Sequence, residues 1–156
     1  MGKEYDTLTN TMTFEGEYLN GRRNGKGKEY NYKGKLAFEG EYLDGKMKKG
    51  KEYCSDGQLK FEGEYLNGKR NGKGKEYYSD GKIKFKGEYL NEKRWNGKGY
   101  NKEGKIDFEI KKGNGKGKEY NVNGEVIFKG EYLNGKRNGK GKEYYPMVNQ
   151  NLKENI

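Results

Sequence analysis

The sequence lacks most of the residues on which active sites depend. Among its 156 residues there is no histidine, one cysteine, Cys54, and one proline, Pro146. Without histidine the chain has neither the commonest general base nor the commonest metal ligand. A single cysteine excludes an internal disulfide and a zinc cluster, and with no base to activate it we interpret Cys54 as an ordinary strand or turn residue. We therefore expect no catalytic residues, no cofactor and no metal site.

Apolar residues are also scarce, at 29% of the chain against 37% charged residues. This balance is not that of a compact globular core. No apolar run approaches membrane-spanning length, and the first twelve residues have no apolar stretch of the signal-peptide kind. With one cysteine and a net charge of +10, we expect a cytoplasmic protein, either free or peripheral to a membrane or the cytoskeleton.

What the chain does have is a repeat marked by its six phenylalanines, which follow one another at intervals of 24, 23, 24, 23 and 20 residues. The cleanest copies read FEGEYLNGKRNGKGKEY. Such a period is typical of repeat arrays, and fixed aromatic spacing argues against disorder. We predict an N-terminal cap or flexible segment over 1–12, a six-copy array over 13–145 and a C-terminal tail over 146–156.

Each copy alternates two short runs, FEGEYL and GKGKEYY, with Asn-Gly or Asp-Gly between them. Those dipeptides are typical of tight turns between antiparallel strands. A helix is not favoured, because each interior glycine costs about 1 kcal/mol against alanine. The sequence predicts an all-β fold: an elongated, single-layer, twisted antiparallel meander of tandem hairpins.

Strand alternation predicts two different faces, because successive side chains point to opposite sides. In the second copy Phe38, Gly40 and Tyr42 share one face, and Glu39 and Glu41 share the other. For the third hairpin we predict a register that sets opposite charges across the strands. The expected pairs are Glu62 with Lys75, Glu64 with Lys73, and Tyr65 with Gly72.

The repeat resembles the MORN repeat, in which aromatics and glycines alternate in this order. The third copy carries the pattern as Phe61, Gly63, Tyr65, Gly68, Gly72 and Gly74. The last copy repeats it as Phe128, Gly130, Tyr132, Gly135, Gly139 and Gly141. The cleanest copies differ from the family pattern in having 24 residues and tyrosine in the second aromatic position, and their second strand, GKGKEYY, is similar to that of a bacterial-type variant of the repeat. The resemblance implies a row of hairpins and a part in scaffolding, self-association or membrane-linked assembly.

The copies are not equal. Glu92 replaces a turn glycine, Trp95 is inserted in the fourth copy, and the fifth copy is the shortest and lacks the Gly and Tyr of the GEY core. Because unequal strands disrupt a ladder, we predict an irregularity over residues 91–115. Trp95, the only tryptophan, is a candidate for a unique contact, although an exposed loop residue without a partner is the simpler interpretation.

The aromatic and glycine face is the candidate partner surface, since a single layer leaves part of such a face exposed. The leading hypothesis is a non-catalytic scaffold that binds a protein partner, or a second copy of itself, through this face. The candidate residues are Phe14, Tyr18, Phe38, Tyr42, Phe61, Tyr65, Phe85, Tyr89, Phe108, Phe128 and Tyr132.

Basic residues recur where each hairpin turns, and they predict a cationic row along one edge of the sheet. These residues are Arg22, Arg23, Lys46, Lys48, Lys69, Arg70, Lys93, Arg94, Lys111, Lys112, Lys136 and Arg137. The alternative hypothesis is that this row binds anionic phospholipid at a membrane surface, while solubility alone also explains it.

Nucleic acid is not favoured, because no recognition motif is present. The GKGK runs lack the helix and Ser/Thr of a phosphate loop and are better interpreted as room for aromatic rings.

Overall fold

A computed structural model of the chain describes residues 1–146, and within that range it contains thirteen strands and no helix. The expected tail over 146–156 lies outside the described residues except for Pro146. The strands are β1 (Gly2–Tyr5), β2 (Met12–Leu19), β3 (Arg22–Tyr30), β4 (Leu36–Leu43), β5 (Lys46–Tyr53), β6 (Leu59–Leu66), β7 (Lys69–Tyr77), β8 (Ile83–Leu90), β9 (Lys93–Tyr100), β10 (Ile106–Ile110), β11 (Gly115–Tyr120), β12 (Val126–Leu133) and β13 (Lys136–Glu143).

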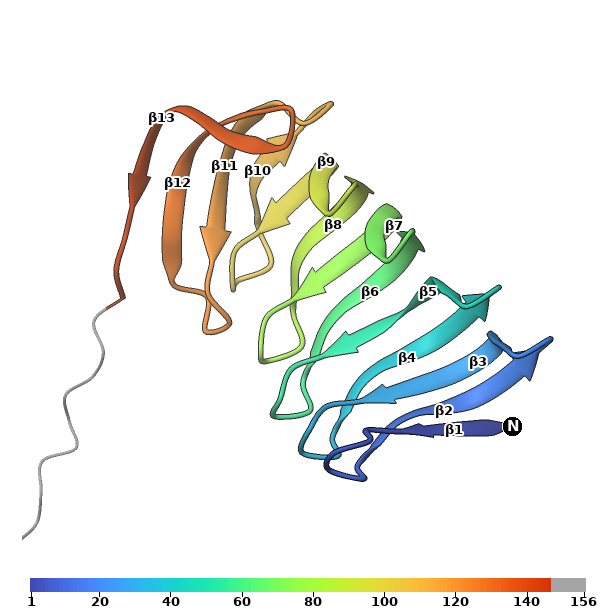
Figure 1. The fold of residues 1–156 in the computed structure, drawn as a ribbon. Helices are drawn as coiled ribbons and strands as arrows, with labels where there is room; N and C mark the ends of the chain where they lie inside the picture. The colour runs from blue at the N-terminus through green and yellow to red at the C-terminus, as the bar shows by residue number, and fades with distance from the viewer. Residues whose placement is uncertain (147–156) are drawn as a thin grey trace, which may run out of the picture.

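The strands form an antiparallel meander in which each strand pairs with its neighbours in the sequence (Figure 1). The predicted all-β fold of tandem hairpins is confirmed. The meander is divided into a ten-stranded sheet, β1 to β10, and a three-stranded sheet, β11 to β13. We call β2, β4, β6, β8 and β12, which carry Phe-x-Gly-x-Tyr, the first strands of their copies. The strands that follow them, β3, β5, β7, β9 and β13, together with β11, are the second strands.

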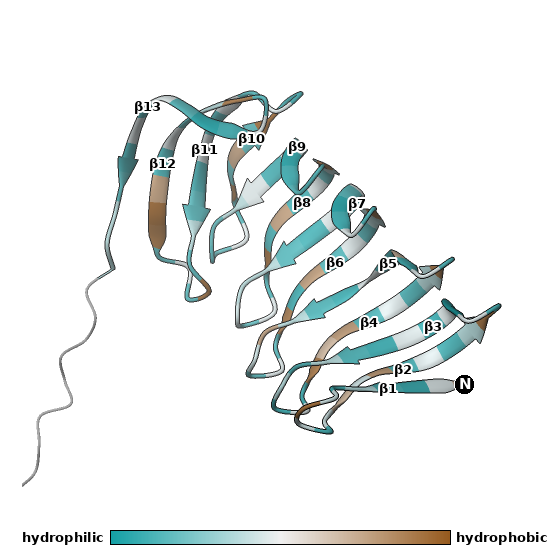
Figure 2. Cartoon of the chain, viewed as in Figure 1, coloured by the Kyte–Doolittle hydropathy of each residue, from teal (hydrophilic) through white to brown (hydrophobic). Residues whose placement is uncertain are grey.

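The hydrophobic core is one face of this sheet. Hydrophobic residues are concentrated on the first strands (Figure 2). In these strands the phenylalanine and the tyrosine that stands two positions after the glycine share a face. Eight of these rings have between 0% and 9% of their surface exposed. Neighbouring rings meet edge to face, as for Phe61 and Tyr89, whose centroids lie 5.2 Å apart. The face predicted from strand alternation is therefore confirmed, and it forms a continuous aromatic core along the sheet.

The recurring glycines make room for the phenylalanine rings. A Cβ atom at Gly63 would lie 2.7 Å from Cζ of Phe61, and one at Gly74 would lie 2.5 Å from the same atom. Both distances are shorter than a side chain tolerates. The ring is thus seated on the bare backbone of two paired glycines, Gly63 and Gly74, which confirms the interpretation of the GKGK runs.

The predicted register is right in one part and wrong in another. Glu62 pairs with Lys75, as expected, but Tyr65 pairs with Arg70 rather than with Gly72. A shift in register between Gly63 and Tyr65 causes the difference. Glu64 has no paired residue in β7, and its carboxylate instead accepts the N–H of Lys73 at 2.7 Å. Gly72 pairs with Tyr89 of the next copy, so tyrosine lies opposite glycine between copies and not within one hairpin.

The irregularity predicted for residues 91–115 is confirmed, because the sheet divides there. An isolated bridge between Lys111 and Asn114 joins β10 to β11, and the two strands then separate. In β10 the glycine position holds Ile110, which is buried, and the tyrosine position after the strand holds Lys112. The ring of Phe108 fills the space above Gly99 and stacks on Phe85, with 6.3 Å between ring centroids.

Beyond this division, side chains from the aromatic face of the first sheet cover the edge of β11. Lys84 Nζ donates to the carbonyl of Tyr120 at 2.8 Å, and Arg94 Nη1 donates to the carbonyl of Lys118 at 3.3 Å. The N–H of Ser79 donates to the carbonyl of Val122. The free edge of the second sheet is therefore closed by side chains and a loop.

Candidate functional site

The aromatic residues predicted to form a partner face are core residues. Phe14, Phe38, Phe61, Phe85, Phe128, Tyr42, Tyr65 and Tyr89 are buried, and Tyr18, Phe108 and Tyr132 are partly buried. We expected a partly exposed aromatic surface, and in this respect the expectation was wrong. The rings cover one another, and arginine side chains cover them further. A partner could reach few of these atoms without opening the core.

Each arginine of the KR pairs closes a unit that joins two copies. Arg70 donates from Nε and Nη2 to the two carboxylate oxygens of Glu52, at 2.9 and 2.7 Å. The hydroxyl of Tyr65 donates to the same carboxylate at 2.5 Å. The guanidinium carbon of Arg70 lies 4.1 Å from the centroid of the Phe61 ring. We call this arrangement the Arg–Glu–Tyr unit; its glutamate comes from the second strand of the preceding copy.

The Arg–Glu–Tyr unit recurs along the array. Its members are Arg23, Glu4 and Tyr18 in the first copy, Arg94, Glu76 and Tyr89 in the fourth, and Arg137, Glu119 and Tyr132 in the last. In the second copy Met47 stands in the arginine position. There Glu29 accepts the hydroxyl of Tyr42 and a hydrogen bond from Arg23 of the first copy.

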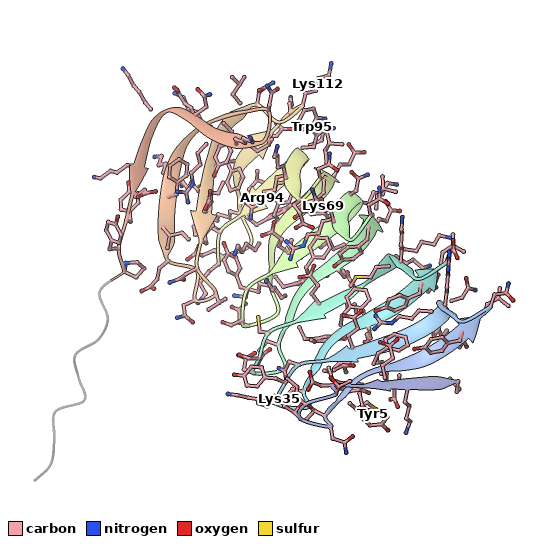
Figure 3. The ribbon with its side chains drawn as sticks, viewed as in Figure 1. Tyr5, Lys35, Lys69, Arg94, Trp95 and Lys112 are labelled. Carbon is pink, nitrogen blue, oxygen red and sulfur yellow. The ribbon has the colours of Figure 1, made fainter. Side chains whose placement is uncertain are left out.

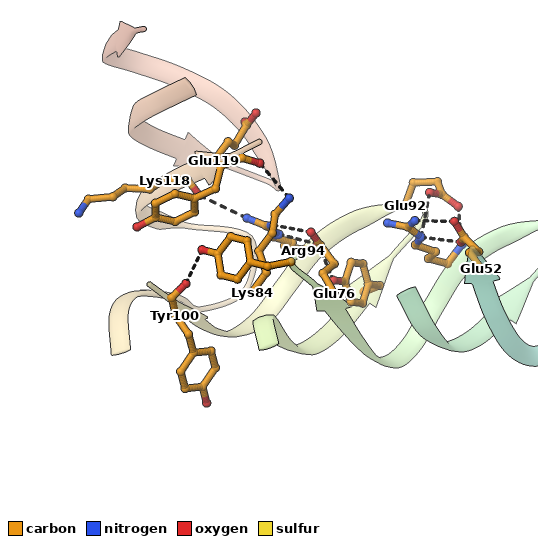
Figure 4. A network of polar contacts seen from close by, with 12 residues as sticks. Glu52, Glu76, Lys84, Glu92, Arg94, Tyr100, Lys118 and Glu119 are labelled. Carbon is orange, nitrogen blue, oxygen red and sulfur yellow. Dashed lines mark hydrogen bonds and ion pairs between the residues drawn. The ribbon is translucent and has the colours of Figure 1, made fainter. Parts of the chain in front are cut away.

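The unit in the fourth copy is the most buried. Arg94 and Glu76 lie 2.6 Å apart with 18% and 14% of their side chains exposed. Burial raises the pKa of Glu76, but the charge and hydrogen bonds of Arg94 and the hydroxyl of Tyr89 outweigh burial and lower that pKa to about 2. Arg94 also reaches Lys118 of the second sheet (Figure 4). This unit therefore holds copies and sheets together.

The predicted cationic row is thus smaller than the sequence suggests. Arg23, Arg70, Arg94 and Arg137 belong to Arg–Glu–Tyr units and are not free loop charges. The other members lie along the turns, where Figure 3 shows Lys69 and Lys112. Three of them have a side-chain partner: Arg22 pairs with Asp44, Lys46 bonds to Asn67, and Lys111 pairs with Glu109. Lys48, Lys69, Lys112 and Lys136 are exposed, and Lys93 is half-buried.

Trp95 lies at the division of the sheet, beside the turn that carries Lys112 (Figure 3). It is half-buried. Its carbonyl accepts the N–H of Gly113 at 2.7 Å, and a Cβ atom at Gly113 would lie 2.7 Å from Cζ3 of the indole. The tryptophan therefore packs on the backbone of this turn, at the point where the sheet divides. This half-buried position differs from the exposed loop residue that we expected.

The opposite face of the sheet carries glutamates, lysines and a groove. A hollow of about 690 Å³ crosses β4 to β8, with the backbone of paired glycines such as Gly63 and Gly74 as its floor and Glu62, Glu64 and Lys73 among its walls. A second hollow, of about 490 Å³, continues it across β2 to β4. The two share residues of β4, so they form one groove perpendicular to the strands. We call this side of the sheet the Glu/Lys face.

Tyrosines of the second strands hold the walls of the groove in place. Tyr77 donates to Glu62 at 2.6 Å, and Lys75 lies 3.2 Å from the same carboxylate. Tyr53 donates to Glu39, and burial together with that carboxylate raises the pKa of Tyr53 to about 12. The walls are therefore ordered by neutral tyrosine donors as well as by ion pairs.

A row of exposed leucines lies along the same face. In β6, Leu66 is two and four positions from Glu64 and Glu62 and therefore points to the same side. The equivalent leucine of every copy except the fifth has between 41% and 58% of its surface exposed. The row consists of Leu19, Leu43, Leu66, Leu90 and Leu133. Strand alternation is sufficient to place leucine on this face, but we did not identify the row as a candidate site from the sequence.

Lys84 is an additional buried cation that strand alternation did not predict. It precedes Phe85 at a shift in register between Glu76 and Tyr77 of the neighbouring strand, so its side chain turns toward the aromatic side. Burial lowers the pKa of Lys84. Tyr78, which is also buried, donates to the carbonyl of Tyr100 close by (Figure 4). Both residues serve the contact between the two sheets.

Over residues 1–146, no group of three or more His, Cys, Asp or Glu side chains is placed to hold a metal ion. Within the same range, no helix has the length and apolar character needed to cross a membrane. Cys54 lies in the turn after β5, where its N–H donates to the carbonyl of Gln58.

The model of the MORN repeat matches four segments of the chain, 14–35, 38–59, 61–83 and 128–147, which together make up more than half of its length. The chain belongs to the MORN repeat family. MORN repeats are a non-catalytic repeat type known in scaffolds that bind proteins or membranes. No curated protein matches the chain.

The four matched segments are the regular copies of this MORN protein. Residues 84–127, which contain the fourth and fifth copies, are not matched. The count of six copies is therefore not confirmed by the family model. The unmatched stretch is also where the sheet divides between β10 and β11.

Proposed function

We propose that this MORN protein is a non-catalytic scaffold that binds a protein partner across its Glu/Lys face. The row of exposed leucines beside the groove carries the proposal. Leu43, Leu66 and Leu90 lie on the same face as the larger hollow, each two positions after a glutamate of its wall. Exposed apolar side chains that recur in such a row are a feature of partner surfaces. The aromatic rings contribute indirectly, because they hold the strands that present this face.

The spacing of the leucines restricts the partner. Consecutive copies lie two strands apart, which is about 10 Å. An α-helix repeats a position every seven residues, about 10.5 Å, and a polyproline helix does so every three residues, about 9.3 Å. An extended β-strand advances about 10 Å in three residues, and its successive side chains point to opposite sides. Two side chains three residues apart would therefore point in opposite directions, and only one of them could contact a leucine. The partner segment is therefore helical, of either kind, with apolar residues at one of these intervals.

A triple variant, Leu43→Ser, Leu66→Ser and Leu90→Ser, tests this function. We expect its affinity for a partner captured by the wild-type protein from native lysate to fall by about tenfold or more, because apolar contact area is lost. The matched control replaces Lys46, Lys69 and Lys136 by glutamine and is expected to retain the partner. Equal retention by the leucine variant would exclude the leucine row as the contact surface.

A second candidate function, contact with anionic phospholipid, is supported by the arrangement of the turns. Backbone bonds join neighbouring turns, as from Gly45 to Arg23 and from Glu92 to Arg70, and these hold the exposed lysines along one edge. Each cation near an anionic membrane surface contributes about 1 kcal/mol. Sedimentation with phosphatidylserine vesicles should then weaken strongly when Lys48, Lys69 and Lys136 become glutamine. Unchanged sedimentation of that variant would exclude this mechanism.

A further inference from the structure

Strand β13 is a second strand without the neighbour that every other second strand has. β3, β5, β7 and β11 are each paired with a following strand that carries the first-strand pattern. In the described residues β13 pairs only with β12, and all eight of its residues are exposed. The sequence of residues 147–156 contains neither an aromatic residue nor a glycine, so it does not carry the first-strand pattern.

The sequence of β13 carries the surface on which first strands dock elsewhere in the molecule. Its residues Lys140 to Glu143 read Lys-Gly-Lys-Glu, the same as Lys26 to Glu29 of β3. On β3 this run pairs with β4, with Glu29 opposite Phe38 and Gly27 opposite Gly40. The two lysines of the run lie opposite Glu39 and Glu41. The position before the glycine is glutamate in β4 and β6 but lysine in β8 and β12, whereas the position after it is glutamate in all four. An incoming strand on β13 therefore needs an acidic residue directly after its glycine, opposite Lys140.

Glu143 is the acceptor that a docking tyrosine would use. The equivalent glutamates, Glu29, Glu52, Glu76 and Glu119, each accept the tyrosine hydroxyl of the following copy at 2.5 to 2.7 Å. Glu143 accepts a bond from Arg137 of its own hairpin at 2.7 Å, and 55% of its side chain is exposed. The hydroxyl of Tyr145 lies 3.4 Å from it, at the far limit of a hydrogen bond.

A single strand is sufficient to complete this unit, as the second copy demonstrates. Glu29 accepts Tyr42 from the following strand and Arg23 from its own hairpin, while Met47 stands where the following hairpin would supply an arginine. Glu143 already has the equivalent of Arg23 in Arg137. The missing part is therefore a first strand alone, without its hairpin.

We propose that the free edge of β13 binds, by strand addition, an extended segment of another protein with the pattern Phe-x-Gly-acidic-Tyr. A folded second copy is not this partner. In the described residues β2, β4, β6, β8 and β12 are each paired on both sides, and β10, which is free on one side for most of its length, lacks the glycine and the tyrosine. The site is separate from the leucine row, so neither proposal depends on the other.

The test is a titration of the full chain into a fluorescent peptide with the sequence of β4, Leu-Ala-Phe-Glu-Gly-Glu-Tyr-Leu, followed by anisotropy. We expect saturable binding, which becomes about tenfold weaker when the peptide tyrosine is replaced by phenylalanine, because a hydrogen bond to a charged group is lost. A peptide with lysine in place of both glutamates should not bind. The variant Glu143→Gln should weaken binding to a similar extent, and Glu103→Gln, at an exposed glutamate of a distant turn, should leave it unchanged.

Hydrogen exchange supplies a second measurement that locates the peptide. The amides of β13 should exchange more slowly with the peptide bound, while those of β1, at the other end of the meander, should not change. The proposal is overturned if no saturation occurs up to about 1 mM protein. It is also overturned if the lysine peptide binds equally well, or if protection appears at β1 and not at β13.

Discussion

At the scale of single residues, a residue's neighbours in space decide its role more than its type does. Arginine and lysine stand side by side in NGKR, yet Arg70 is ion-paired and stacked on Phe61 whereas Lys69 is exposed. Strand alternation separates the two, since Arg70 pairs with Tyr65 and Lys69 with Leu66. The sequence could have indicated this distinction, but the shift in register concealed which glutamate was the partner.

The buried Arg94–Glu76 pair should contribute far more to stability than the exposed pairs. Replacing Glu76 by glutamine leaves Arg94 buried without a counter-charge, and removing one partner of a buried pair costs about 3–5 kcal/mol. The matched control is Glu41→Gln, whose partner Lys49 lies 3.2 Å away at the surface and whose loss costs about 0–1 kcal/mol. Urea unfolding of both variants measures the difference. Equal losses would contradict the role assigned to this unit.

Acid should destabilise the protein through the same glutamates. Hydrogen bonds from Arg23 lower the pKa of Glu4 to about 2, and Arg94 lowers that of Glu76 to about 2, against an ordinary value of 4.5. Because the folded-state pKa is depressed, the stabilisation is fully present above pH 4.5 and is lost as the pH falls toward 2. The free energy of unfolding measured across this interval should fall steeply for the wild type and less steeply for Glu76→Gln. The same slope for both proteins would exclude this origin.

At the scale of strands and hairpins, the sequence predicted the element type, the hairpins and the aromatic face. These follow from the turn dipeptides and from alternation, which are local properties. The shift before Phe85, which turns Lys84 toward the aromatic side, and the pairing of Gly72 with Tyr89 depend on strands of neighbouring copies. No local pattern encodes these two features. For this reason part of the predicted register, and the predicted position of the arginines, were wrong.

The paired glycines provide a test of this face assignment. In Gly74→Val the new side chain would meet the Phe61 ring and should cost about 1–3 kcal/mol or more through overpacking. In Lys73→Val, one position away on the exposed Glu/Lys face, the change should be within about 0.5 kcal/mol. Thermal unfolding of the two variants compares them. A larger loss for Lys73→Val would mean that the faces are reversed.

In the irregular fourth and fifth copies, residues that would contact one another are missing together. β9 has no glutamate before Tyr100, Lys112 stands where the next tyrosine would be, and no arginine follows it in the fifth copy. All three members of one Arg–Glu–Tyr unit are therefore absent together, and in the described residues no buried side-chain polar atom lacks a partner. The missing residues were visible in the sequence, but their relation was not, because the unit joins residues of different copies.

At the scale of the whole molecule, the array is quasi-one-dimensional, and its stability depends on the neighbours of each copy. Strands β5 to β7 have neighbours on both sides in the ten-stranded sheet, whereas β13 has one within the described chain. Hydrogen exchange should therefore be slowest in β5 to β7 and fastest in β13, with a change between β10 and β11 where the sheet divides. Uniform protection along the array would contradict this division.

The central claim is that the aromatic side of the sheet is a core and that the Glu/Lys face, with its row of leucines, binds the partner. The most direct measurement is the relative retention of the partner by the Leu43→Ser, Leu66→Ser, Leu90→Ser variant and by the matched lysine variant, at equal thermal stability. The account predicts a loss of about tenfold or more for the leucine variant alone. Full retention by the leucine variant, or loss only in the lysine variant, would contradict it.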